Sequence, residues 1–321
     1  MKAMRIHETG GPEVLRYEDI PDPTPGPGQV VVKLSAIGVN YVDIYTRSGL
    51  YPASLPLIPG SEGAGVVAAV GEGVTGVAAG DVVAYTGIPG SYAQQVVAPA
   101  DRLVKLPTGL SAEMGAAVLL QGMTAHYLAH TTYPLKPGDR ALIHAGAGGV
   151  GLLLIQMAKQ RGAYVFATVS TDAKAALARE AGADAVILYT RQDFAEEVRT
   201  ATEGQGVQVV YDSVGQTTFF KSLECLVPRG YLVLYGQSSG PVPPVEPGIL
   251  ARGSYFLTRP SLAHYTASRE ELLQRAGDVL DWVRSGALKV RIYGSYPLAR
   301  AADAHRALQG RETTGKLLLI P

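Results

Sequence analysis

A short glycine-rich stretch in the middle of the chain constrains the fold more than any other feature. Residues 142–151 (Leu-Ile-His-Ala-Gly-Ala-Gly-Gly-Val-Gly) carry a strand pattern directly into glycines spaced as G-x-G-x-x-G, and an apolar helical pattern follows from Val150 to Met157. The first glycine permits a tight turn, the second lets the backbone approach a pyrophosphate, and the third lets helix and strand pack closely. The stretch predicts a dinucleotide-binding turn at a helix N-terminus, with contacts from Gly146, Ala147, Gly148, Gly149, Val150 and Gly151.

The segment after the second expected strand indicates which dinucleotide is bound. A site specific for NAD places Asp or Glu about 20 residues beyond the fingerprint, where the carboxylate accepts from the ribose 2′-OH. This chain offers Ser170 and Thr171 there, with Lys174 one helical turn later. The nearest acid, Asp172, or Thr171 before it, is more simply explained as a helix N-cap. A hydroxyl and a cation suit a 2′-phosphate, which predicts NADPH; the alternative is that Lys174 is an ordinary solvated helix residue.

The composition excludes several classes of partner. The chain has 28 basic and 28 acidic residues and no long like-charge run, which argues against nucleic acid or a membrane surface held by bulk electrostatics. No apolar run has membrane-spanning length, and residues 1–6 follow a strand pattern without signal-peptide features. The single cysteine, Cys225, excludes an intrachain disulfide and is expected to be buried in a helix. The expected compartment is the cytoplasm.

From about residue 136 the chain alternates between strand and helix patterns. Apolar strands alternating with amphipathic helices predict a parallel, doubly wound Rossmann sheet, whose ligand crevice lies at the carboxyl ends of the strands. Strands are expected at residues 141–145, 164–169, 185–189, 207–212, 231–235 and 254–258, and the clearest later helices at residues 193–202 and 217–226.

The rest of the chain has a different character. Short alternating strands at residues 29–35, 63–70 and 92–98, separated by Gly and Pro turns, predict a mostly antiparallel β domain. A long amphipathic helix is expected over Arg269–Ser285, and the tail returns to strand character at residues 290–292 and 316–320. The tail is expected to rejoin the N-terminal domain. The predicted domains are therefore a catalytic domain of residues 1–124 and 264–321 and a cofactor domain of residues 125–263.

Two glycine-rich segments in the β domain carry a family resemblance. Residues 59–67 (Pro-Gly-Ser-Glu-Gly-Ala-Gly-Val-Val) and 70–74 (Val-Gly-Glu-Gly-Val) resemble the medium-chain dehydrogenase/reductase superfamily, and the match runs the whole length. The resemblance implies a GroES-like β domain beside the Rossmann domain. Where its alcohol dehydrogenases have metal ligands, this chain has Asn40, Ser61 and Gln121, so no metal is expected. His126 and His130 have the spacing of a zinc pair, but Tyr127 stands where a hydrolytic motif needs Glu, and two ordinary helix-face histidines are expected.

Longer matches point to one group within that superfamily. Residues 38–52, 211–215, 235–240 and 258–262 resemble zinc-free quinone oxidoreductases, the group that includes ζ-crystallin. This resemblance implies an NADPH-dependent quinone reductase that forms a homodimer through its cofactor domains. It places Asn40 near the nicotinamide, and Tyr45 and Tyr51 along the substrate site. The cofactor contacts that it implies beyond the turn are Asn40, Gln121, Thr124, Ser170, Lys174, Tyr189, Ser213, Val214, Gly236, Gln237, Ser238 and Lys316.

The predicted reaction is hydride transfer from NADPH to a flat, conjugated acceptor, without metal. Negative charge builds on the acceptor oxygen, so an amide or hydroxyl donor is useful there, and Asn40 and Tyr51 are the candidates, with water as an equal alternative. A second hypothesis is reduction of the double bond of an α,β-unsaturated ketone or aldehyde with the same cofactor. A hypothesis of another class is a nucleotide-binding structural protein, as in lens crystallins.

The last expected strand of the parallel sheet predicts how the chain assembles. An apolar edge at Tyr255, Phe256 and Leu257 leaves backbone N–H and C=O groups to be paired or covered, and no Pro or Lys interrupts it. Pairing with its own copy across a two-fold axis would satisfy both edges. We therefore expect a homodimer joined through this strand; the alternative is a loop that covers the edge within a monomer.

Overall fold

The structure, a computed structural model, describes residues 1–321 and contains two compact units. Unit 1 comprises residues 1–123 and 266–321, and unit 2 comprises residues 124–265. The first boundary between the units lies within helix α2 (Ala112–Tyr127), and the second boundary directly follows α7 (Leu262–Tyr265). No helix in the structure has the length and apolar character needed to cross a lipid bilayer.

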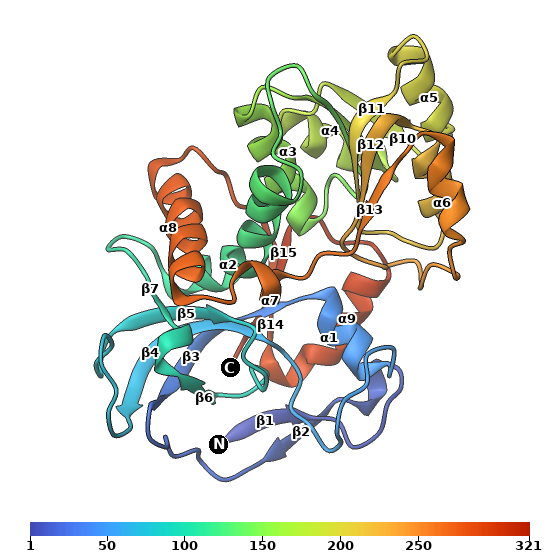
Figure 1. The fold of residues 1–321 in the computed structure, drawn as a ribbon. Coiled ribbons are helices and arrows are strands. Elements are labelled where there is room, and N and C mark those ends of the chain that lie inside the picture. The colour runs from blue at the N-terminus through green and yellow to red at the C-terminus, as the bar shows by residue number, and fades with distance from the viewer. The chain divides into compact units, whose positions relative to one another are not determined.

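Unit 2 contains the predicted doubly wound parallel sheet (Figure 1). Its order is β10-β9-β8-β11-β12-β13, so the chain builds outward from β8 in one direction and then outward from β11 in the other. All five strand pairs are parallel, which confirms the predicted fold class. The strands are β8 (Arg140–Ile143), β9 (Tyr164–Val169), β10 (Ala185–Leu188), β11 (Val207–Asp212), β12 (Leu226–Leu234) and β13 (Phe256–Thr258).

Helices cover both faces of this sheet because its strands are apolar on both sides. In Figure 1, α3 and α4 lie on one face, and α5 and α6 lie on the other. Their bounds are α3 (Gly149–Gln160), α4 (Asp172–Glu180), α5 (Phe194–Ala201) and α6 (Phe219–Leu223).

The helix expected over residues 217–226 is shorter than predicted. It ends at Leu223, and Leu226 already pairs with Val207 as the first residue of β12. Cys225 therefore lies between helix and strand, not in a helix as expected, although it is buried as expected. Its burial raises the pKa of the thiol to about 12, which keeps the sulfur unreactive at neutral pH.

Unit 1 is built on a mostly antiparallel sheet that the C-terminal tail joins. The order is β14-β15-β3-β4-β5-β7, with β6 also paired to β3, and β14 and β15 are its one parallel pair. The prediction that the tail returns to the N-terminal domain is confirmed, although β14 begins at Ile292 and the strand expected at residues 290–292 lies largely before it. The strands are β1 (Lys2–Arg5), β2 (Arg16–Asp19), β3 (Gln29–Val39), β4 (Glu62–Val70), β5 (Val82–Thr86), β6 (Gln95–Pro99), β7 (Val104–Lys105), β14 (Ile292–Pro297) and β15 (Lys316–Ile320), and the remaining helices are α1 (Tyr41–Arg47), α8 (Arg269–Ser285) and α9 (Ala301–Gln309).

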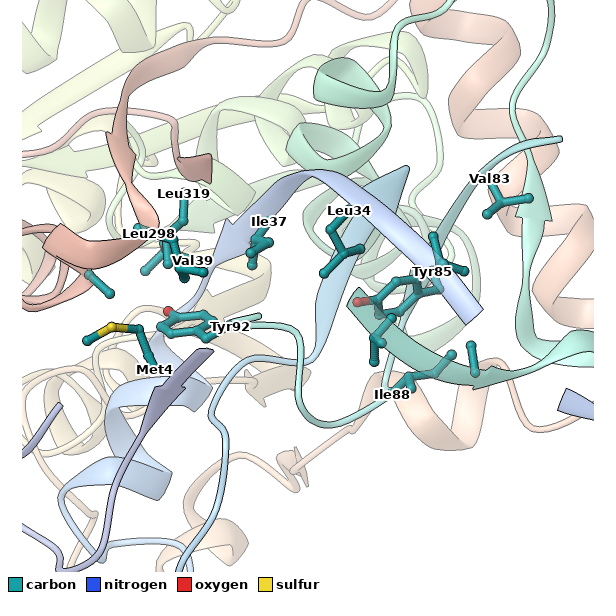
Figure 2. Close-up of a cluster of buried hydrophobic side chains, with 14 of the residues drawn as sticks. Met4, Leu34, Ile37, Val39, Val83, Tyr85, Ile88, Tyr92, Leu298 and Leu319 are labelled. Atoms are coloured by element: carbon teal, nitrogen blue, oxygen red, sulfur yellow. The ribbon is translucent and has the colours of Figure 1, made fainter. Parts of the chain in front are cut away.

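The core of unit 1 joins segments from both ends of the sequence. Figure 2 shows Met4 near the N-terminus and Leu319 near the C-terminus in one buried cluster with Ile37 of β3 and Tyr92. Full burial of an aliphatic side chain of this size stabilises the folded state by about 1.5–3 kcal/mol. The two distant segments therefore depend on each other for a large part of their stability.

Candidate functional site

The turn between β8 and α3 is built as the glycine spacing predicts, with one difference. A Cβ on Gly151 would overlap the carbonyl oxygen of Ala145, and a Cβ on Gly146 would lie 2.8 Å from the Cβ of Ala167 in β9. The left-handed conformation falls on Ala145, whose φ is 52°, and not on a glycine. Gly146 thus allows the turn to pack on β9, and Ala145 carries a conformation that costs an L-residue roughly 1–2 kcal/mol.

The N-terminus of α3 fits a phosphate group. The helix begins at Gly149, and its N-cap, Gly148, has no side chain that could accept from the first turn. The first N–H groups of a helix have no partner within the helix. This end lies at the carboxyl ends of the strands, next to β8 and β11, between which the order of strand addition in the parallel sheet reverses. Uncapped N–H donors at such a switch point are what the pyrophosphate of a dinucleotide requires.

The segments after β9 and β10 bring Ser170 and Tyr189 to the same edge of the sheet. Val169 lies opposite Leu188 in the parallel pair, and Tyr189 N donates to Val169 O at 3.1 Å. Lys174 lies in the first turn of α4, where its backbone N–H donates to the Oγ1 of Thr171. Thr171 is therefore the N-cap of α4, which leaves Asp172 as the first residue of the helix.

The segment after β11 is held by a buried acid that the sequence analysis missed, and backbone hydrogen bonds join it to the segment after β12. Asp212 is wholly buried, and its Oδ1 accepts from Val214 N at 2.7 Å and Gly215 N at 3.0 Å. Ser238 N donates to Ser213 O at 3.1 Å, so two of the predicted cofactor-contact segments lie together. The available signal was a lone Asp at the end of an apolar strand, directly before Ser-Val-Gly. Gly236 and Gln237 lie in the segment after β12.

In unit 1, the side chain of Asn40 forms hydrogen bonds with both members of a buried ion pair, Lys316 and Glu62. Lys316 of β15 is wholly buried, and its Nζ donates to Glu62 Oε2 at 2.5 Å and to Asn40 Oδ1 at 2.8 Å. The partners of Lys316 within the chain lie in β4 and at the start of α1, and its contact with the cofactor stays a prediction.

The amide of Asn40 is engaged at both ends. Its Nδ2 donates to Glu62 Oε2 at 2.9 Å and, more weakly, to Gly38 O at 3.3 Å, while its Oδ1 accepts from Lys316. The other carboxylate oxygen of Glu62 accepts from the backbone N–H of Leu120, next to Gln121 in α2. One carboxylate therefore ties together the two segments of unit 1 in which Asn40 and Gln121 were predicted to act.

The predicted substrate tyrosines lie on and directly after α1, the helix that Asn40 precedes in the same unit. Tyr45 is on α1 and 8% exposed, and its ring centroid lies 5.2 Å from that of Tyr51. Tyr51 N donates to Tyr45 O at 3.0 Å, which fixes the backbone of the following loop. Of the remaining predicted contacts, Thr124 belongs to unit 2 and is buried.

A second buried network, which the sequence analysis missed, fixes α1. Arg47 Nη1 lies 3.0 Å from Nδ1 of His305, and His305 Nε2 lies 2.9 Å from the Tyr92 hydroxyl. Tyr92 donates to Asp43 Oδ2 at 3.0 Å, and Asn40 N donates to the same oxygen at 2.8 Å. Burial lowers the pKa of His305 to about 3, and burial raises the pKa of Asp43 to about 7 against these two hydrogen bonds. No short-range pattern links His305 to Arg47, 258 residues away.

The structure shows no group of three or more His, Cys, Asp or Glu side chains arranged to hold a metal ion. The rings of His126 and His130 stack with centroids 4.5 Å apart, and His130 Nδ1 lies 3.0 Å from the carbonyl oxygen of His126. Metal independence itself stays a prediction for experiment.

Comparison with known proteins places the whole chain in one family. Residues 26–108 match the alcohol dehydrogenase GroES-like domain, and residues 149–277 match a family described as zinc-binding dehydrogenase. A quinone oxidoreductase from Pseudomonas aeruginosa is 46% identical, over 100% of this chain and 99% of the relative. A 2-haloacrylate reductase from Burkholderia sp is 44% identical, over 98% of each. The crystal structure of Escherichia coli quinone oxidoreductase complexed with NADPH superimposes with a TM-score of 0.98 at 44% identity, over 100% of both chains.

These similarities extend over both units and agree with the fold and with the glycine-rich turn. They confirm the resemblance that the sequence motifs predicted. The chain therefore belongs to the quinone oxidoreductase family of the medium-chain dehydrogenase/reductase superfamily.

Proposed function

We propose that this protein is an NADPH:quinone oxidoreductase that works without a metal ion. The observation that carries the proposal is the uncapped N-terminus of α3, at the switch point of a parallel sheet, in a chain that belongs to this family. When bound, NADPH supplies a hydride from C4 of its nicotinamide ring. The residues of this chain bind and orient the cofactor and stabilise charge on the acceptor.

The cofactor contacts are proposed from unit 2. The backbone of Gly146–Gly151 would bind the pyrophosphate through the N–H groups at the start of α3. Ser170, Lys174 and Tyr189, which follow neighbouring strands, would bind the adenosine 2′-phosphate. The joined segments that contain Ser213–Val214 and Gly236–Ser238 would bind the nicotinamide half. Thr124 would contribute from α2.

The acceptor contacts are proposed from unit 1, where Tyr45 and Tyr51 present two neighbouring rings. A flat quinone gains dispersion and hydrophobic contacts against such rings. An O–H or N–H donor stabilises the charge that develops on the acceptor oxygen. Both N–H bonds of Asn40 are directed at Glu62 and Gly38, so we favour the Tyr51 hydroxyl or a water molecule as the donor.

A panel of acceptors tests this proposal. NADPH oxidation is measured with the purified protein and, in turn, a simple benzoquinone, a cyclic enone and a 2-haloacrylate. We expect the highest kcat/KM with the quinone. A higher value with an unsaturated carbonyl compound would favour the second candidate function, double-bond reduction, which the similarity to a 2-haloacrylate reductase supports. No oxidation with any acceptor would favour a nucleotide-binding structural protein.

We further propose that two copies pair through β13, the edge strand of the parallel sheet (Figure 1). Phe256 is 49% exposed and Leu257 is 37% exposed, and this edge has no strand partner within the chain. Antiparallel pairing of two such edges across a two-fold axis satisfies both. Phe256→Pro removes a strand hydrogen bond and should lower the mass measured by light scattering from dimer to monomer. A monomeric mass for the wild-type protein at micromolar concentration would refute the proposal.

A further inference from the structure

The segments that follow β9 and β10 remain joined beyond the ends of the strands. The last strand pair is Val169 with Leu188, and the backbone bond from Tyr189 N to Val169 O continues the ladder. The next residue, Thr190, donates from its Oγ1 to Ser170 O at 3.0 Å. Ser170 and Tyr189, both proposed to bind the 2′-phosphate, are therefore held beside each other by the segments on which they lie.

An ion pair also links the segment after β9 to the segment after β10. Arg191 Nη2 lies 2.9 Å from Asp172 Oδ2, and the two side chains are 65% and 72% exposed. Asp172 is the one carboxylate in the two joined segments, residues 170–174 and 189–191. It occupies the first position of α4, directly after the N-cap Thr171, and Lys174 follows two residues later.

The position of Asp172 matters for cofactor choice. In parallel dinucleotide-binding sheets, a carboxylate after the second strand accepts from the ribose 2′-OH of NAD, and the same charge repels the 2′-phosphate of NADP. In this chain the acid is present one position inside the helix, and its oxygen is directed at a guanidinium from the neighbouring segment. Arg191 thus neutralises the acid that would favour NADH.

We infer that Arg191 is a specificity-determining residue, which sets the preference for a 2′-phosphate by pairing with Asp172. The inference rests on the proposed use of NADPH. It predicts effects of opposite sign for the two members of one ion pair. Arg191→Met exposes the carboxylate and removes a cation, which weakens binding of a 2′-phosphate. Asp172→Asn removes the repulsion and frees Arg191 to interact with the phosphate, so binding of a 2′-phosphate becomes stronger.

The test measures binding of adenosine fragments to the intact protein by isothermal titration calorimetry. Adenosine 2′,5′-bisphosphate carries the discriminating phosphate, and 5′-AMP lacks it. At low ionic strength, Arg191→Met should raise the Kd of the bisphosphate roughly two- to fivefold, and Asp172→Asn should lower it by a similar factor. The Kd of 5′-AMP should not change, and the double variant should return the bisphosphate Kd toward the wild-type value.

A matched control comes from α5, where Arg199 pairs with Glu196 at similar exposure, 66% and 67%. Arg199→Met removes the same charge from α5, which lies on the face of the sheet opposite to α4 (Figure 1), and it should leave both Kd values unchanged. The effects of Arg191→Met should also shrink when salt is added, because the groups are exposed.

Three results would overturn the inference: equal changes for both ligands, an effect of Arg199→Met as large as that of Arg191→Met, or weaker bisphosphate binding in Asp172→Asn. Failure of the proposed function gives a different result. In that case the wild-type protein itself would bind adenosine 2′,5′-bisphosphate no more tightly than 5′-AMP.

Discussion

The buried pair of Lys316 and Glu62 makes a stability prediction that can be worked out from the structure. Replacing Lys316 by Met keeps a long, unbranched side chain but removes the ammonium. Glu62 then retains two donors, Leu120 N at 2.7 Å and Asn40 Nδ2 at 2.9 Å, and has lost its cation in a site with no solvent exposure. Breaking a buried pair in this way costs about 3–5 kcal/mol. That is a large part of the roughly 5–15 kcal/mol by which a domain is stable.

Neutralising both partners should have a much smaller effect. In the double variant Glu62→Gln with Lys316→Met, the Gln oxygen can still accept from Leu120 N and no charge is left unpaired. Removal of both members of a buried pair is often neutral. We therefore expect the double variant to recover most of the stability that Lys316→Met loses. Lys33→Met, at an exposed position in β3, is the matched control and should change stability by less than about 0.5 kcal/mol.

The assay is unfolding in urea, followed by far-UV circular dichroism. A double variant as unstable as the single variant would refute this reasoning, since the loss would then come from packing and not from an unpaired charge. A cost below about 1 kcal/mol for Lys316→Met would refute it as well.

Cofactor preference, metal independence and acid stability can each be tested by one comparison. Lys174→Ala should weaken NADPH binding about tenfold and hardly change NADH binding, because a charge-assisted phosphate contact is lost; equal weakening would contradict this role. Activity should survive exhaustive chelation, and loss of activity that zinc restores would contradict metal independence. The pKa of His305 is about 3 in the folded protein and about 6.5 when unfolded, so the unfolded chain binds the extra proton between these values. Stability of the wild type relative to His305→Gln should therefore rise by about 1.4 kcal/mol per pH unit from about pH 4 to about pH 6 in urea titrations. A constant difference would show that His305 is not held neutral.

Elements with local signals could be predicted from the sequence with accurate bounds. The helix expected over Arg269–Ser285 has these bounds in the structure, because the Ser268 side chain accepts from Glu271 N at its start and Gly286 adopts a left-handed conformation at its end. Both signals lie within a few residues of the helix ends they define. The six parallel strands were predicted because apolar runs alternate with helices along the chain, although β12 begins at Leu226, before the expected start at residue 231.

The contents of the candidate site depend on contacts that no local pattern encodes. The pairing of Lys316 with Glu62 and Asn40 was not predicted, because these partners are 254 and 276 residues away in the sequence. The left-handed conformation of Ala145 could not be predicted either, since the adjacent Gly146 has the higher preference for it. Asp212 stood in the sequence as one acid at a strand end, and the structure shows that its carboxylate accepts from the backbone of the turn that follows.

The hydrogen bonds of the second buried network have a fixed donor and acceptor order from Arg47 to Asp43. Arginine does not give up its proton, so Nδ1 of His305 must accept from Arg47 and Nε2 must donate to Tyr92. Tyr92 in turn donates to Asp43, whose carboxylate also accepts from the first N–H before α1. The network therefore holds α1 at both ends, at Asp43 in its first turn and at Arg47 in its last. Tyr45 lies between these two anchors, so its ring is presented from a helix that neither end can easily release. The predicted contact of Tyr45 with an acceptor would therefore be made from a preformed backbone.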